Sequence, residues 1–325
     1  MAPKFFFQTR RFNFSFWGII ALGAVIGSIY LWDNDLSLSL YWRQRAAADP
    51  FLHDFARFMA RTLPEDGIFG GQDLSYLLLL PYVIFYLICA VAPPMRRKYQ
   101  FSSFYQSAGY ITAAALAMTA VNRGMKTFFA RARPGDLGRI KDGLAQEFSR
   151  MWEVGSQSPA AAFSNGSFPS GHTNTAVALV VLVYILMPTN RIRLVVGRFL
   201  LAISWAMLMG FGRVCSGSHY PSDVLWSIVI GLLLLGWIYF RVLRVPEQRT
   251  GKFRIYTANG ELLWGLSFFM FVAGITSAAV GIRYFVTTLE WRWFLAFLGG
   301  AFGTFIFYRL MDRILVDPDH NQGIS

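Results

Sequence analysis

Side chains suited to phosphate chemistry gather in three short polar clusters of the sequence. They are Lys126 and Arg133 in KTFFARARP, Ser170, Gly171 and His172 in PSGH, and Arg213, His219 and Asp223 in GRVCSGSHYPSD. The set contains cations, histidines, a carboxylate and small residues that admit a ligand to the backbone. Together they could bind an anion and carry out group transfer on it.

The cations indicate what kind of anion this would be. Lys126, Arg133 and Arg213 lie at the ends of apolar stretches, where charges left unpaired beside lipid are costly. A doubly negative phosphate would satisfy all three, because guanidinium groups bind its oxygens in pairs and lysine adds a point charge. Ser170 and Gly171 open the next apolar stretch, and the first amides of a helix also favour an anion. We therefore predict a site for phosphate or a vanadate-like anion.

The two histidines and the aspartate could supply the nucleophile and the acid for group transfer. Asp223 follows His219 by four residues, so the two share a face if a helix begins near HYPSD. A carboxylate on one imidazole nitrogen fixes the tautomer and leaves the other nitrogen as a nucleophile. His172 can then protonate the leaving oxygen. Because Arg and Lys meet the charge on the phosphate oxygens, we expect neither a metal nor another cofactor.

These clusters must be positioned by membrane helices. Of the 325 residues, 55% are hydrophobic and only 15% are charged, against about 25% in soluble domains. Repeated apolar runs of about 20 residues indicate an all-α, polytopic transmembrane helix bundle. We expect eight spans, at residues 15–32, 74–93, 101–122, 172–188, 195–212, 222–240, 262–285 and 293–311.

Charge predicts the orientation. The net charge is +12, and Arg and Lys recur in the short loops that would be cytoplasmic if the N-terminus is inside. Both termini are then cytoplasmic, and all three polar clusters lie on the outer face, the periplasmic side if the membrane is a bacterial inner membrane. Since the basic residues are scattered and do not form one surface, we do not expect nucleic-acid binding.

Two long outer loops are expected, at residues 33–73 and 123–171. Their amphipathic stretches, 51–62 and 143–152, fit interfacial helices that either pack against the bundle or act as a lid. We expect His53 to be exposed, and Arg131 and Arg139 to be solvated loop charges.

The three motifs resemble those of the type 2 phosphatidic acid phosphatase superfamily, which includes membrane lipid phosphate phosphatases. The family pattern is K-x6-RP, then PSGH, then SR-x5-H-x3-D, and the chain departs from it only at Gly212, where the pattern has Ser. A small residue remains there, so we expect helix packing to survive. The family fold implies a six-span phosphatase core over residues 1–245, with two additional spans and a cytoplasmic tail over 246–325.

The resemblance also implies roles for individual residues. His219 would form a phosphohistidine, His172 would be the acid that later activates water, and Asp223 would orient His219. The phosphate would be held by Lys126, Arg133, Ser170, Gly171 and Arg213.

The expected function is that of a metal-independent lipid phosphatase. It would remove a terminal phosphate, from a monoester or a pyrophosphate, on an outer-leaflet lipid such as a lipid A type or polyprenyl pyrophosphate. Two alternatives stay open: a phosphotransferase that uses the same histidine, and a transporter of anionic lipids without enzymatic activity. The sequence does not decide the lipid or the oligomeric state.

Overall fold

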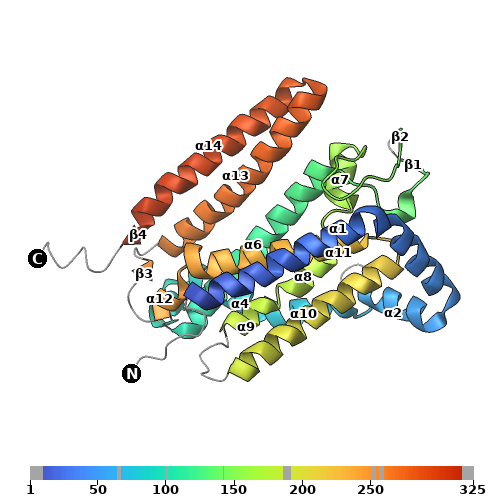
Figure 1. Cartoon of the computed structure of the whole chain (residues 1–325). Coiled ribbons are helices and arrows are strands. Elements are labelled where there is room, and N and C mark those ends of the chain that lie inside the picture. The colour runs from blue at the N-terminus through green and yellow to red at the C-terminus, as the bar shows by residue number, and fades with distance from the viewer. Residues whose placement is uncertain are drawn as a thin grey trace, which may run out of the picture. The chain divides into compact units, whose positions relative to one another are not determined.

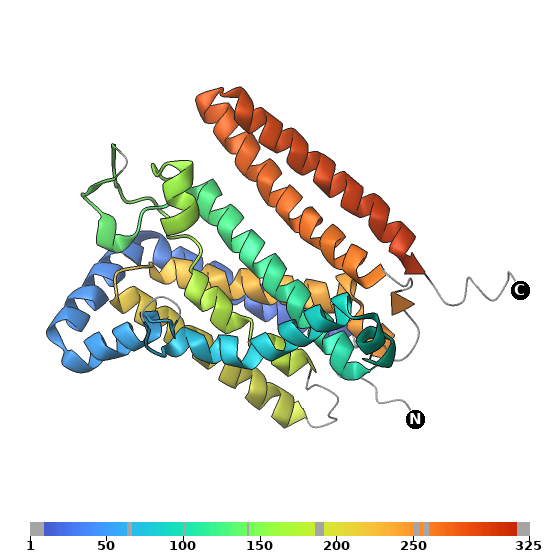
Figure 2. The ribbon, with the colours of Figure 1, turned by 180° about the vertical axis from the view of Figure 1, so that it is seen from behind.

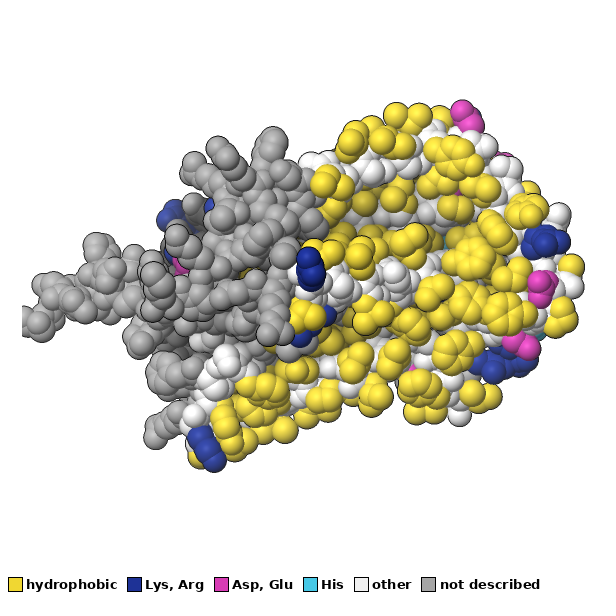
Figure 3. All heavy atoms as spheres, turned by 60° about the horizontal axis from the view of Figure 1, so that its bottom comes forward, with side chains coloured by type: hydrophobic (Ala, Val, Ile, Leu, Met, Phe, Trp, Pro, Cys, Tyr) yellow, Lys and Arg dark blue, Asp and Glu magenta, His cyan; other side chains and the backbone are white. Residues whose placement is uncertain are grey.

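A computed structural model describes residues 10–63, 67–99, 102–141, 143–185, 192–249, 254–255 and 260–316. The protein is an all-α, polytopic integral membrane protein (Figure 1). Within the described residues, five helices are long and apolar enough to cross a membrane. On the described part of the face drawn in Figure 3, hydrophobic side chains predominate, as expected of a surface in contact with lipid.

The chain forms two compact units. The first comprises residues 1–78 and 125–233, and the second comprises residues 79–124 and 234–325. Elements wholly within the first unit are α1 (Arg10–Ala48), α2 (Pro50–Ala60), η2 (Pro134–Asp136), β1 (Ile140–Lys141), β2 (Leu144–Ala145), α7 (Pro159–Asn165), α8 (Gly171–Val177), α9 (Val180–Ile185) and α10 (Ile192–Cys215). Those of the second are α5 (Pro93–Tyr99), the π-helix η3 (Ile238–Val242), α12 (Val245–Arg249), β3 (Arg254–Ile255), α13 (Gly260–Thr288), α14 (Trp291–Ile314) and β4 (Leu315–Val316). The helices α4 (Gly71–Val91), α6 (Ser103–Phe129) and α11 (Pro221–Trp237) contribute residues to both units.

Each of the eight expected spans corresponds to helix. The span expected at 172–188 is divided into α8 and α9 by a turn at Ala178 and Leu179, and its last residues, 186–188, lie outside the described residues. The N-terminal residues 1–9 and the tail from 317 also lie outside them.

The expected start of the first outer loop, at residue 33, is wrong because α1 continues to Ala48. Its last third is polar, yet it stays helical since Asp35 and Ser39 turn into the protein and are buried there. The helix α2 then begins after Asp49, whose carboxylate accepts hydrogen bonds from the amides of Phe51 and Leu52 at 2.9 and 3.3 Å. The predicted amphipathic helix at 51–62 therefore corresponds to α2.

Helix α2 packs against α1 and α10 in the first unit. Ala46, Ala56 and Cys215 form the centre of this contact, and Trp42 meets the ring of Phe211 edge-on at 4.9 Å between centroids. Gly212 lies directly beneath α2, because a Cβ atom built there would lie 2.5 Å from Cβ of Met59. The residue that departs from the family pattern thus lies in the contact between these two helices.

The predicted amphipathic helix at 143–152 is wrong. Ile140 and Lys141 pair in antiparallel fashion with Ala145 and Leu144, and Gly143 takes a φ of 74°, which is readily accessible to glycine. The segment that follows runs to a turn at Met151 and Trp152 without helix. A glycine at the apex of the turn and the pairing of β1 with β2 override the helical spacing of the apolar residues.

In the second unit, α13 and α14 form an antiparallel helical hairpin (Figure 2). Glycines face the partner helix at close range, since a Cβ atom on Gly300 would lie 2.5 Å from the amide nitrogen of Ala278. Aromatic pairs flank this contact, including Tyr284 with Trp293 at 4.8 Å between ring centroids. Small residues permit this backbone approach between membrane helices.

Candidate active site

The first polar cluster begins in the last turn of α6. Lys126 is buried, and its Nζ donates a hydrogen bond of 2.7 Å to the carbonyl oxygen of Gly166. The helix ends at Phe129, and Ala130 adopts a left-handed conformation with a φ of 47°. This turn directs the following residues away from the helix axis. Arg133 lies three residues after Ala130, is partly exposed and directly precedes η2.

The second cluster begins α8. Ser170 is its N-cap, and its Oγ accepts from the amide of Thr173 at 3.4 Å. Gly171 is the first residue of the helix, which follows a cis peptide bond between Phe168 and Pro169. His172 is one residue further, and its Nε2 lies 3.2 Å from the carbonyl oxygen of Ala60 at the end of α2.

The third cluster joins α10 to α11. Arg213 is buried in the last turn of α10, and its carbonyl oxygen accepts from the amides of Ser218 and His219 at 3.0 and 3.3 Å. Gly217, with a φ of 68°, reverses the chain in this loop. Helix α11 begins at Pro221, within HYPSD, so Asp223 lies in its first turn and His219 lies two residues before it.

His219 is buried, and a backbone carbonyl sets its tautomer. Its Nδ1 lies 2.7 Å from the carbonyl oxygen of Ser167 and 3.5 Å from Oδ2 of Asp223. Since a carbonyl oxygen can only accept a hydrogen bond, Nδ1 carries the proton and the lone pair resides on Nε2. Burial lowers the pKa of His219 to about 3; Asp223 opposes this shift, whereas the positive charges of Lys126 and Arg213 add to it. The imidazole is therefore neutral near pH 7.

Asp223 reaches His219 by folding back over the start of α11. Its Oδ2 accepts from the amide of Tyr220 at 2.8 Å and from the hydroxyl of Ser167. Its Oδ1 accepts from Nη1 of Arg131 at 2.7 Å. The carboxylate is fully buried, so these donors replace the water that it loses.

The expectation that Arg131 is a solvated loop charge is wrong. Only 1% of its surface is exposed, whereas the side chain of Arg139 is 64% exposed, as expected. The guanidinium group of Arg131 lies between two carboxylates, those of Asp223 and Asp35, at 2.7 Å from each. His53 is exposed as predicted.

Sequence reasoning missed four buried residues of this region: Asp35, Arg131, Ser167 and Ser222. Asp35 is the residue that sequence could have suggested, because a carboxylate close to an apolar span needs a partner. The partner itself lies 96 residues away in the chain. Ser167 contacts His219 through its backbone carbonyl and Asp223 through its hydroxyl. The carbonyl contact could not be predicted from the residue type, because every residue has a backbone carbonyl.

Hydrogen bonds bring the three clusters together in the first unit. The amide of Ser167 donates to the carbonyl of Arg131 at 2.8 Å, and that of Gly135 donates to Gly217 at 2.8 Å. The hydroxyl of Ser227 donates to the carbonyl oxygens of both Ser170 and Asp223, at 3.1 and 2.6 Å. His172 interacts electrostatically with His219 and with the cations Arg213 and Lys126. The predicted site residues thus come from segments that are joined at the starts of α8 and α11.

This arrangement contains a neutral histidine with a defined tautomer beside buried cations, which suits an attack on an anionic phosphate. Among the described residues, no three His, Cys, Asp or Glu side chains are grouped so that they could hold a metal ion.

Comparison with known proteins extends this picture. Residues 106–245 match the family model described as the PAP2 superfamily. The undecaprenyl-diphosphatase BcrC of Bacillus subtilis (strain 168) is 34% identical over 83 residues, which cover 24% of this chain and 36% of the relative. Lipid A 1-phosphatase of Rhizobium etli is 38% identical over 77 residues, covering 24% of this chain and 27% of the relative.

A lipid A 1-phosphatase of Rhizobium johnstonii is 37% identical over 65 residues, covering 20% of this chain and 23% of the relative. The chain therefore spans about a third or less of the length of these relatives. No solved structure matches it.

Proposed function

We propose, on the premise that residues 106–245 match the PAP2 superfamily, that the protein is a lipid phosphatase of the membrane that forms a phosphohistidine on His219. The observation that carries the proposal is the contact of Nδ1 of His219 with the carbonyl of Ser167, which leaves the lone pair on Nε2. The nearby cations Lys126 and Arg213 support the binding of a phosphate at that nitrogen.

The reaction would proceed in two steps. Nε2 of His219 attacks phosphorus, a bond forms between nitrogen and phosphorus, and the bond to the lipid oxygen breaks. His172, in its doubly protonated form, gives one proton to that oxygen and becomes neutral, so the dephosphorylated lipid leaves as an alcohol, or as a monophosphate if the substrate is a pyrophosphate. Water then attacks phosphorus, His172 takes a proton from it, and inorganic phosphate leaves as His219 is restored.

Each remaining site residue has a place in this mechanism. Asp223 stabilises the positive charge that the ring of His219 acquires when it is phosphorylated. Lys126, Arg133 and Arg213 bind the phosphate oxygens, and Ser170 and Gly171 bring the start of α8 to it. Since these cations take the part that magnesium plays in other phosphoryl transfers, we propose that the enzyme is independent of metal.

The substrate that we propose is a lipid with a terminal phosphate, of the lipid A type or a polyprenyl pyrophosphate. The names of the relatives support both choices, since they include an undecaprenyl-diphosphatase and two lipid A 1-phosphatases. The distribution of Arg and Lys favours cytoplasmic termini and a site on the outer, periplasmic face of a bacterial inner membrane.

Phosphate release by the purified protein in detergent tests the proposal. The panel should contain lipid A, undecaprenyl pyrophosphate and phosphatidate, each with and without EDTA. We expect release in EDTA from one class of lipid. A strict requirement for magnesium would contradict the mechanism, and transfer of the phosphoryl group to a second lipid without release of phosphate would identify a phosphotransferase.

A further inference from the structure

We infer that Arg131 is a positioning residue for the reaction, which holds Asp223 in the orientation that serves His219, and that Asp35 holds Arg131 in turn. This inference rests on the proposed function. It assigns a role to two residues that are not fixed positions of the family pattern: Arg131, which lies between Lys126 and Arg133 in the first motif, and Asp35 of α1.

Each of the three side-chain nitrogens of Arg131 donates a hydrogen bond within the buried network. Its Nε donates to the carbonyl oxygen of Ser149 at 2.8 Å. Its Nη1 donates to Oδ1 of Asp223 and to the hydroxyl of Ser222, at 2.7 and 2.8 Å. Its Nη2 donates to Oδ2 of Asp35 at 2.7 Å. The planar guanidinium group is therefore fixed in direction as well as in place.

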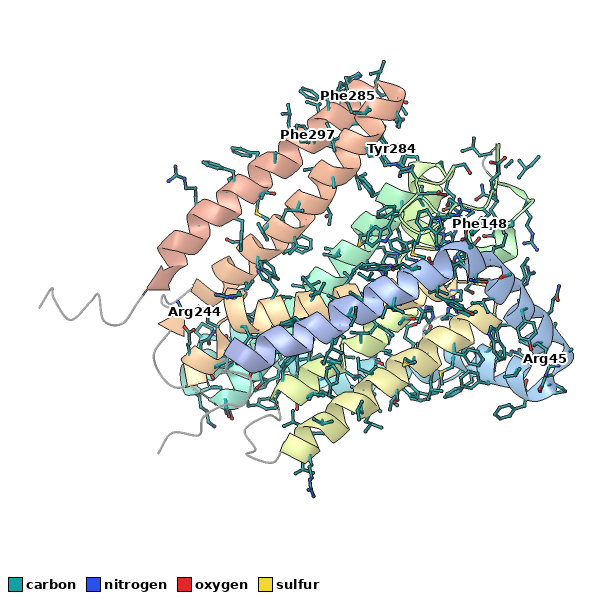
Figure 4. All side chains as sticks on the ribbon, viewed as in Figure 1. Arg45, Phe148, Arg244, Tyr284, Phe285 and Phe297 are labelled. Carbon is teal, nitrogen blue, oxygen red and sulfur yellow. The ribbon has the colours of Figure 1, made fainter. Side chains whose placement is uncertain are left out.

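Aromatic rings enclose the same group. The Cζ atom of Arg131 lies 3.9 Å from the centroid of the Tyr220 ring and 5.7 Å from that of Phe148, which is labelled in Figure 4. Tyr220 is the neighbour of His219 in the chain, and its amide donates to Asp223. Contact with Tyr220 thus couples the guanidinium group to the backbone that carries the proposed nucleophile.

The two oxygens of Asp223 have separate tasks as a result. Oδ1 faces Arg131, so Oδ2 is left to face Ser167, the amide of Tyr220 and Nδ1 of His219. Rotation of the carboxylate would break the contact with Arg131. The ring of His219 gains positive charge when it takes up the phosphoryl group, and an oxygen held at this position stabilises that charge.

Asp35 accounts for the remaining part of the network. It accepts from the amide of Ser222 at 2.9 Å, and from the hydroxyl of that residue. Ser222 directly precedes Asp223, so α1 is tied to the start of α11 by a backbone contact and by the shared cation. Arg131 is the only positive charge among these three ionisable groups, so its removal would leave two buried carboxylates without their cation.

Substitution of Arg131 by methionine, in the full-length protein in detergent, tests the inference. We expect kcat for phosphate release to fall about 100-fold, with KM and the inhibition constant of inorganic orthovanadate within about threefold of the wild type. The matched control is Arg139→Met, which removes an exposed arginine of the same loop and should leave all three constants unchanged. An unchanged kcat in Arg131→Met, or a loss confined to KM and orthovanadate binding, would overturn the inference.

Two further variants separate positioning from folding. The double variant Arg131→Met/Asp35→Asn restores the charge balance, so its thermal midpoint should recover toward the wild type while kcat stays low; recovery of kcat as well would show a structural role only. Arg131→Lys keeps the charge but loses the planar fork, and we expect kcat to fall about 10-fold with normal thermal stability. A wild-type kcat in this folded variant would also overturn the inference.

The wild type in the same assay separates this inference from the proposed function. If the wild type releases no phosphate from any lipid of the panel, the proposed function fails. If it releases phosphate and the Arg131 variants do so equally well, only the positioning role fails.

Discussion

The candidate site and the α13–α14 hairpin belong to the same membrane protein, yet they are held together by opposite means. At the site, ionised and hydrogen-bonding side chains contact one another and the backbone, as Arg131 does with Asp35 and Asp223. In the hairpin, the absence of side chains at Gly274 and Gly300 lets two backbones meet. Figure 4 labels Tyr284, Phe285 and Phe297, aromatic residues of this hairpin.

The difference follows from what each region must define. A polar network fixes directions, because a hydrogen bond weakens when its angle changes, and a reactive nitrogen needs a direction. Close packing of helices fixes distance, and it tolerates no added volume. Substitutions at the site should therefore alter catalysis more than stability, and substitutions in the hairpin should do the reverse.

The largest effect is expected from His219→Asn. Loss of the proposed nucleophile should lower kcat by about 10⁴-fold or more, because no other group can form the covalent intermediate. The thermal midpoint in detergent should change little, since asparagine can still donate to the carbonyl of Ser167. The control is His53→Asn at an exposed position, which should keep wild-type activity. More than 1% residual activity in His219→Asn would argue against the phosphohistidine.

In the hairpin, Gly300→Ala should destabilise the protein without changing its chemistry. The added Cβ would lie 2.5 Å from both the amide nitrogen of Ala278 and the carbonyl oxygen of Gly274, and backbone atoms cannot easily move aside. We expect a loss of about 2 kcal/mol, seen as a lower thermal midpoint in detergent, with normal kcat.

The neighbouring Gly299 provides a matched control, because a Cβ atom there meets nothing within 4 Å. Gly299→Ala should keep the wild-type midpoint. Equal midpoints for the two variants would mean that close backbone packing does not hold the hairpin.

Gly212→Ser restores the residue of the family pattern and tests the contact between α2 and α10. The expectation from sequence was that a small residue preserves packing, but a Cβ here would lie 2.5 Å from Cβ of Met59. We expect a loss of about 2 kcal/mol, because the Cβ of Met59 is attached directly to the backbone and cannot move aside on its own. Gly197→Ser on the same helix is the control, as nothing lies within 4 Å of a Cβ there.

The last prediction is that the imidazole of His219 does not titrate near neutral pH. The pKa of His219 is lowered to about 3, so its imidazole should stay neutral between pH 7.5 and 5. Nitrogen-15 NMR of histidine-labelled protein can follow this, since the chain has four histidines, and His219→Asn assigns the signal. A midpoint near 6.5 for that signal would contradict the buried, neutral imidazole.

The lowered pKa of His219 also makes the free energy of unfolding depend on pH. The unfolded chain binds a proton at His219 near pH 6.5, whereas the folded protein binds it only near pH 3. The free energy of unfolding should therefore fall as the pH drops through this range.

The sequence by itself determined the membrane helices and the residue types of the site. Apolar runs predict helices because a membrane requires every backbone amide to be satisfied within its own segment. Asp49 and Ser170 begin helices through contacts with amides two or three residues away, which sequence also registers. The residue types of Lys126, His172 and His219, and the resemblance of their motifs to a family pattern, predicted phosphate chemistry before any position in space was known.

Only the tertiary structure decided which of these residues meet. The extension of α1 beyond residue 32, the burial of Arg131 and the tautomer of His219 depend on contacts between distant segments, of which that between Asp35 and Arg131 spans 96 residues. Short-range sequence patterns do not predict such pairs. A buried charge is stabilised by whichever group the fold brings within hydrogen-bonding distance, and that group can come from anywhere in the chain. The helix expected at 143–152 was wrong for a related reason, since the turn at Gly143 and the strand pairing beside it outweighed periodicity.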